Sequence, residues 1–174
     1  MTLNFRTLEA DEIDVRVATV NQKGVTLLLY KDARVDQNIL DEKVGPMNWQ
    51  RRHTRDNANC IVSIWDSEKK QWVEKEDTGT ESFTEKEKGL ASDSFKRACF
   101  NWGIGRELYT APFIWIDAEN AEIKSGSNGK FQCYDKFIVE QIIYDDKKNI
   151  VAISVKNKTK NKRVFVMDNR KKDK

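Results

Sequence analysis

The middle of this sequence reads as three short extended segments, separated by polar turns, followed by one amphipathic helix. Strands are predicted over 50–56, 60–65 and 71–76. In the segment that follows, apolar residues recur at helical spacing on one face: Ala91, Phe95, Ala98, Cys99 and Trp102. This order predicts a β-β-β-α core, in which an antiparallel meander packs on one long helix.

Further predicted elements flank this core on both sides. On the N-terminal side, apolar and polar residues alternate, and this pattern predicts a hairpin over 13–30. Asp32 can cap a helix over 33–43, which Gly45 and the proline after it would end. On the C-terminal side three more strands are predicted: 136–144, 150–155 and 163–167. We therefore predict an α+β protein with an N-terminal hairpin and a C-terminal β appendage.

The segment KSGSNG, residues 124–129, has the composition of a flexible linker. It suggests two regions, a core over 1–120 and a C-terminal β-meander with a basic tail over 121–174. A chain of 174 residues is long enough for one domain with a real core and a small appendage. Three widely spaced cysteines, none in a CxxC pair, are typical of buried thiols in a reducing cytoplasm. The start of the chain lacks a signal-peptide pattern, so we expect a cytoplasmic protein.

Charge is distributed unevenly along the chain. The formal net charge is +3, but residues 156–174 hold nine Lys/Arg and two Asp/Glu, a local net charge of +7. The rest of the chain therefore carries −4. A basic terminus on a near-neutral body is a common footprint of nucleic-acid binding. The alternative is a solvated terminus without a ligand.

Basic residues also occur in both halves of the β-β-β-α core. Arg51 and Arg55 should share one face of the first strand with His53, and Arg52 should point to the opposite face. Such a row suits a sugar-phosphate backbone, although lysine and arginine also protect exposed sheet edges from aggregation. Other candidates are Lys96 and Arg97, which flank the apolar stripe of the helix, and Trp72, which could stack on a base.

Several kinds of chemistry lack their usual sequence signals. The chain has no glycine-rich phosphate loop followed by Lys-Ser or Lys-Thr, which disfavours an ATPase of the P-loop type. His53 is the only histidine, and neither cysteines nor carboxylates stand at ligand spacing from it, which disfavours a structural zinc site. A metal-dependent nuclease would need several convergent carboxylates, and the sequence leaves this possibility open.

The stretch GLASDSFKRACFNWGIGRELY, residues 89–109, resembles the Rad-fifty-two-type single-strand annealing proteins, which include phage and bacterial annealing recombinases. A weaker match covers the meander from Trp49, so the resemblance spans roughly 15–109. The family pattern is read here at these positions: Ser92, Asp93, Phe95, Lys96, Arg97, Ala98, Trp102, Gly103, Gly105, Leu108 and Tyr109.

This resemblance implies roles for particular residues. Lys96 and Arg97 would grip the DNA backbone, and Arg16 would lie in the same groove. Tyr30 would stand near the DNA, although core packing is an alternative role for it. The sequence departs from the family at Phe100, near a place where a further basic residue is common. There Arg106 could supply the charge instead.

The resemblance also implies a function: ATP-independent binding and annealing of single-stranded DNA in homologous recombination and repair. Such a protein is not an enzyme, needs no cofactor and assembles into a homo-oligomeric ring or filament. Besides single-stranded DNA, its partners could include a host or phage single-strand-binding protein or exonuclease in the bacterial cytoplasm. The alternatives are a metal-dependent nuclease or other DNA-processing enzyme, and a non-catalytic adaptor on the same fold.

Overall fold

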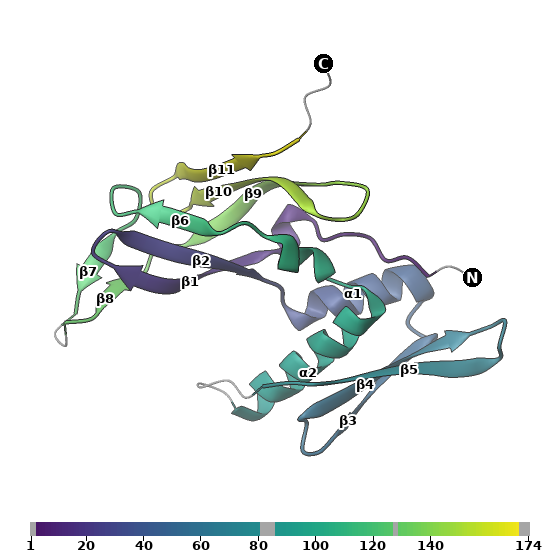
Figure 1. The fold of residues 1–174 in the computed structure, drawn as a ribbon. Coiled ribbons are helices and arrows are strands. Elements are labelled where there is room, and N and C mark those ends of the chain that lie inside the picture. Colours follow the sequence, from purple (N-terminus) through teal and green to yellow (C-terminus); the bar gives the residue numbers. More distant parts are fainter. Residues whose placement is uncertain (1–2, 81–85, 127–128, 171–174) are drawn as a thin grey trace. The chain divides into compact units, whose positions relative to one another are not determined.

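The computed structural model describes residues 3–80, 86–126 and 129–170. The chain forms two compact units (Figure 1). We call Met1–Arg6 with Asp32–Arg106 the helical unit, and Thr7–Lys31 with Glu107–Lys174 the sheet unit. The protein is of mixed α/β type, and its strands pair antiparallel.

The helical unit contains two α-helices and a three-stranded sheet among its described residues. The strand order is β3-β4-β5, so each strand pairs with its neighbour in sequence. The elements in chain order are α1 (Ala33–Val44), β3 (Trp49–Thr54), β4 (Asn59–Asp66), β5 (Gln71–Thr78) and α2 (Lys86–Trp102).

Helix α1 begins and ends where its sequence signals place the boundaries. The side chain of Asp32 accepts a hydrogen bond of 2.8 Å from the backbone N–H of Arg34, which satisfies one of the free donors at the helix start. At the other end Gly45 has a φ of 83°, and its N–H donates to the carbonyl of Asp41. The predicted helix with its two caps is confirmed.

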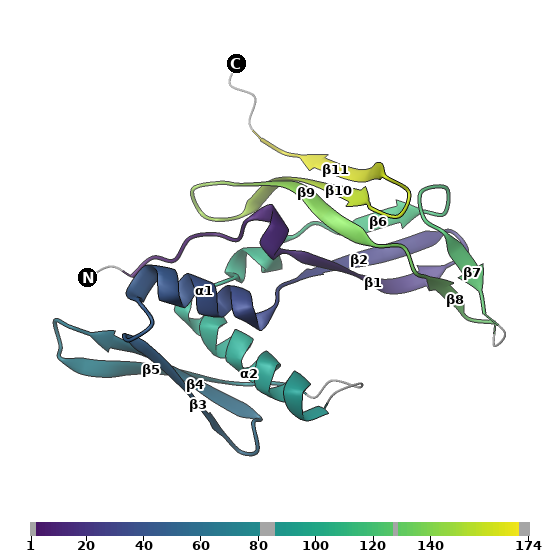
Figure 2. The same ribbon diagram turned by 180° about the vertical axis from the view of Figure 1, so that it is seen from behind.

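Helix α2 packs on β4 and β5 (Figure 2). Phe95 is fully buried, and its ring stacks on Trp49 with 6.1 Å between the ring centroids. The indole N–H of Trp102 donates to the carbonyl of Val62 at 3.0 Å, which ties the helix end to the central strand. Helix α1 also contacts α2 and β3, so two helices rather than one accompany this sheet.

The sheet unit is built on six strands in the order β11-β10-β9-β1-β2-β6. The edge strands β6 and β11 also approach each other, so the sheet is strongly curved. Its strands are β1 (Asp14–Asn21), β2 (Gly24–Tyr30), β6 (Ile114–Asp117), β9 (Phe137–Tyr144), β10 (Ile150–Asn157) and β11 (Lys162–Asp168).

The N-terminal hairpin belongs to the same sheet as the C-terminal strands. Strand β1 pairs with β9 at Asp14 and Ile138, and β2 pairs with β6. The compact units therefore divide the chain differently from the expected regions 1–120 and 121–174. The physical reason is that an isolated two-stranded hairpin is marginal in water, and pairing with β6 and β9 extends it into a stable sheet.

Strand β7 (Ile123–Ser125) includes the first two residues of the expected linker at 124–129, and β8 (Phe131–Cys133) follows it closely, which contradicts the prediction of a flexible linker. The two strands pair, and the N–H of Gly126 donates to the carbonyl of Lys130 at 2.8 Å. Residues 127–128 lie outside the described part. Most of the expected basic tail is also folded, because β10 and β11 reach as far as Asp168.

Two of the three cysteines are buried, as expected, and Cys133 is half-buried. Burial raises the pKa of the Cys60 thiol to about 11, so this group stays protonated near neutral pH. In the described part of the chain, no helix is both long and apolar enough to cross a membrane.

Candidate nucleic-acid interface

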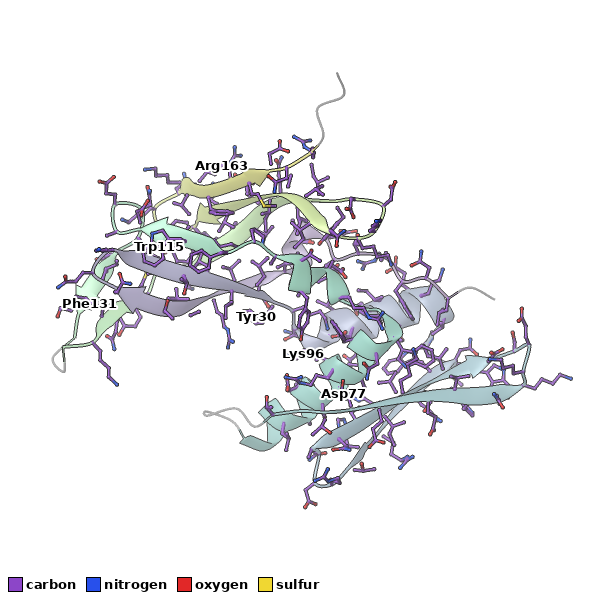
Figure 3. The ribbon with its side chains drawn as sticks, in the orientation of Figure 1. Tyr30, Asp77, Lys96, Trp115, Phe131 and Arg163 are labelled. Carbon is purple, nitrogen blue, oxygen red and sulfur yellow. The ribbon has the colours of Figure 1, made fainter. Side chains whose placement is uncertain are left out.

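Lys96 and Arg97 lie on α2 beside its buried stripe. Figure 3 labels Lys96 on this helix. Phe95, Ala98 and Cys99 are fully buried, so the helical period leaves Lys96 and Arg97 half-buried at the boundary with solvent. The predicted stripe is confirmed at these three residues. The two cations are therefore held by a helix whose orientation is fixed by packing.

Arg97 is held in place by a carboxylate one turn earlier on α2. Its Nε lies 2.9 Å from an oxygen of Asp93, and that oxygen also accepts the backbone N–H of Thr80 at 2.8 Å. Burial opposes ionisation of Asp93, but the hydrogen bonds from Thr80 and Arg97 hold the pKa of this carboxyl below its usual range. Asp93 thus stays charged near neutral pH and orients the guanidinium.

Lys96 lies close enough to Asp32, the N-cap residue of α1, for its positive charge to lower the pKa of that carboxyl. The pKa of Asp32 is lowered mainly by hydrogen bonds from Arg34, with a smaller contribution from Lys96. The ion pair of Asp32 with Arg34 is exposed, and an exposed ion pair contributes only about 0–1 kcal/mol to stability.

The structure places the three arginines of the first predicted core strand in different settings. The guanidinium of Arg51 lies 4.8 Å from the centre of the Phe95 ring, on the sheet face that packs on α2. Arg52 is exposed on the opposite face and pairs with Ile61 of β4. Arg55 lies beyond the end of β3 with a φ of 51°. The predicted row of Arg51 and Arg55 along one strand face is therefore wrong, because the chain turns after Thr54.

His53 follows Arg51 on the same strand face, as predicted. Its Nδ1 lies 3.4 Å from the hydroxyl of Ser94 on α2. Burial, and then the charge of Arg51, lower the pKa of His53 from its ordinary value. The folded protein therefore favours the neutral imidazole.

This shift predicts that the helical unit loses stability in mild acid. The unfolded chain takes up the His53 proton near pH 6.5 and the folded chain only at lower pH, so stability is complete above about pH 7 and falls below it. The lone histidine gives one imidazole signal, whose NMR titration midpoint should lie below 6.5. His53→Gln should remove this part of the pH dependence; an unchanged profile would refute the assignment.

Arg16 and Tyr30 belong to the sheet unit, where they lie on one face of the β1–β2 hairpin. Asp14 pairs with Tyr30 and Arg16 pairs with Leu28, so these four side chains share that face. Tyr30 is 41% exposed, which contradicts the alternative that it packs in the core. Arg16 is exposed as well.

Two cations near α2 have structural contacts that the sequence reading did not find. The ammonium of Lys75 lies 4.8 Å from the Trp102 ring centroid and donates to the carbonyl of Asn101. Arg106 donates to the carbonyls of Phe100 and Asn101 at 2.7 and 2.9 Å. Arg106 thus caps the C-terminus of the helix, where cations are stabilising. For Lys75, the alternation of side chains along β5 was the sequence signal that could have indicated a contact with α2.

The tryptophans differ in their accessibility. Trp72 is 38% exposed and meets Trp65, which is 39% exposed, edge to face with 5.5 Å between ring centroids. Trp72 therefore remains able to contact a ligand, whereas Trp102 is tied to the central strand.

In the part of the chain that the structure describes, no cluster of three or more His, Cys, Asp or Glu residues is arranged to hold a metal ion. No protein-family model, curated protein or solved structure matches this chain.

Proposed function

We propose that this protein binds single-stranded DNA and anneals complementary strands without ATP, as a non-enzymatic protein of recombination and repair. The observation that supports the proposal is the structural role of residues 89–109, the stretch that resembles the annealing proteins. Phe95 and Ala98 lie in the core, Asp93 orients Arg97, and Gly103 has a φ of 99° at the end of α2. Lys96 and Arg97 are the basic residues that this arrangement leaves beside the buried stripe.

The proposed DNA-binding core is the β3–β5 meander with α2. Lys96 and Arg97 would bind phosphates. The further candidate contacts are Arg16, Tyr30, Arg51, Arg52 and Arg55. Neutralising phosphates releases counterions, which favours binding and makes it sensitive to salt. If the protein holds a strand by its backbone, the base edges stay outward and can pair with a second strand.

Annealing by this mechanism calls for many subunits side by side. The two cations of α2 would contact only a few nucleotides, which is too short a stretch for stable pairing of strands. We therefore propose a homo-oligomeric ring or filament, in which neighbouring subunits join short binding surfaces into one track. A single-strand-binding protein or an exonuclease would be a fitting partner in the cytoplasm.

A strand-annealing assay tests this proposal. Two complementary oligonucleotides that carry a fluorescence donor and acceptor are mixed with the protein in EDTA, without nucleotide. We expect pairing to be faster than the spontaneous rate and to depend little on sequence. EDTA also separates annealing from metal-dependent scission, because only the latter needs a divalent ion. A rate equal to the spontaneous one would count against the proposed function.

A further inference from the structure

The helical unit contains a pocket of about 370 Å³ that the proposed DNA contacts do not use. Its volume falls at the lower end of the range for ligand sites, which is about 300–1,000 Å³. Six apolar residues line it: Leu3, Val44, Ile64, Trp65, Val73 and Trp102. We call it the tryptophan pocket, because two of these residues, Trp65 and Trp102, are tryptophans.

The polar groups that line the pocket are mostly engaged within the protein. The amide of Asn48 donates to the carbonyl of Val44 at 2.8 Å. One oxygen of Asp66 accepts the backbone N–H groups of Glu68 and Lys69 at 3.0 and 3.1 Å. The indole N–H of Trp102 is bonded to Val62. The pocket therefore suits an apolar group better than one with many donors and acceptors.

Two lysines among the lining residues supply positive charge. Lys43 is exposed in the last turn of α1. The Lys69 side chain is 65% exposed, and its contact with Asp66, at 3.6 Å, is long and exposed enough to be weak. A ligand with carboxylates beside its apolar group would thus place those negative charges near Lys43 and Lys69.

We propose that the tryptophan pocket binds a short acidic peptide segment of a partner protein, which inserts one bulky apolar side chain. The inserted side chain contacts Ile64, Val73 and Trp102, and flanking carboxylates pair with Lys43 and Lys69. A bulky side chain that fills a small apolar pocket is typical of the positions that dominate protein–protein binding.

A nucleic acid fits the same pocket less well. A base carries several ring and exocyclic polar atoms, and burying them without hydrogen-bond partners is costly. Binding of the peptide therefore does not depend on the proposed annealing function.

Fluorescence anisotropy of the full-length protein with a synthetic peptide tests this inference. The probe is fluorescein-labelled Gly-Ser-Asp-Asp-Phe-Asp-Ser-Gly, compared with one peptide in which alanine replaces phenylalanine and another in which serines replace the aspartates. We expect saturable binding of the first peptide and at least about tenfold weaker binding of each of the others. No binding up to about 1 mM, or equal binding of the alanine peptide, would overturn the proposal.

Charge-changing variants test whether the peptide binds in the tryptophan pocket. Lys43→Glu with Lys69→Glu should weaken peptide binding by about tenfold or more, because the carboxylates then meet like charges. Lys23→Glu with Lys147→Glu makes the same charge change on turns of the sheet unit and should alter binding less than about twofold. Lys43→Ala with Lys69→Ala is a milder variant in case the reversal impairs folding, which circular dichroism checks, and it should give an intermediate loss.

A competition experiment tests whether the peptide and single-stranded DNA bind at different sites. Unlabelled oligothymidine should not displace the peptide at a concentration that saturates DNA binding. Displacement by oligothymidine, or equal losses in the pocket variant and the control variant, would contradict a peptide site in this pocket. If annealing fails but the peptide binds as described, the inference stands without the proposed function.

Discussion

Replacing Phe95 by alanine is expected to lower the free energy of unfolding by about 3–5 kcal/mol. Phe95 is fully buried, its ring stacks on Trp49, and the guanidinium of Arg51 lies over it. The alanine variant would leave a cavity between α2 and the sheet and would remove the surface on which Arg51 rests. Urea denaturation followed by tryptophan fluorescence measures the loss.

Phe113→Ala provides a matched control for this substitution. Phe113 is 75% exposed in the sheet unit, so the same change of side chain there should alter stability by no more than about 0.5 kcal/mol. If both variants unfold at the same urea concentration as the wild type, then Phe95 does not hold α2 on the sheet.

Replacing both Lys96 and Arg97 by alanine is expected to weaken binding of single-stranded DNA by about a hundredfold or more, because each of the two lost hydrogen bonds to a charged group contributes about 1.5–3 kcal/mol. The fold should remain, since both side chains lie beside the buried stripe and Asp93 keeps its bonds to Thr80. Fluorescence anisotropy with labelled oligothymidine measures affinity, and circular dichroism checks the fold.

The control for this pair is Lys23→Ala with Lys147→Ala. It removes two positive charges from exposed turns of the sheet unit and should leave DNA affinity within about twofold of the wild type. Equal losses in both double variants would mean that the effect follows net charge alone and that α2 has no special role.

Local signals in the sequence predicted local structure well. The caps of α1 follow from Asp32 and Gly45, since capping chemistry depends on residues within one turn of the helix end. The buried face of α2 follows from the spacing of Phe95, Ala98 and Cys99, because helix periodicity is fixed. The positions of Lys96 and Arg97 beside that face could be predicted for the same reason.

Long-range pairing could not be predicted in this way. Nothing in the local pattern of β1 indicates that Asp14 pairs with Ile138, more than a hundred residues later. The glycine- and serine-rich segment near 124–129 is compatible with either a linker or a hairpin turn, and only the pairing of β7 with β8 decides between them.

Two features of the candidate interface depend on geometry that residue types do not specify. Arg55 leaves the face of Arg51 because the backbone enters a left-handed turn there, which alternation along a strand does not reveal. The contact of Arg51 with Phe95 needs a strand and a helix to meet. Sequence reasoning therefore found the basic residues but not which of them pack on aromatic rings.

The salt dependence of DNA binding tests most directly whether the Lys96–Arg97 pair holds a single strand by its phosphates. The logarithm of the oligothymidine association constant is plotted against the logarithm of salt concentration for the wild type and the Lys96→Ala, Arg97→Ala variant. Each lost phosphate contact should make the slope shallower by about 0.7, so a change of about 1.4 is expected. Identical slopes for the two proteins would contradict the account.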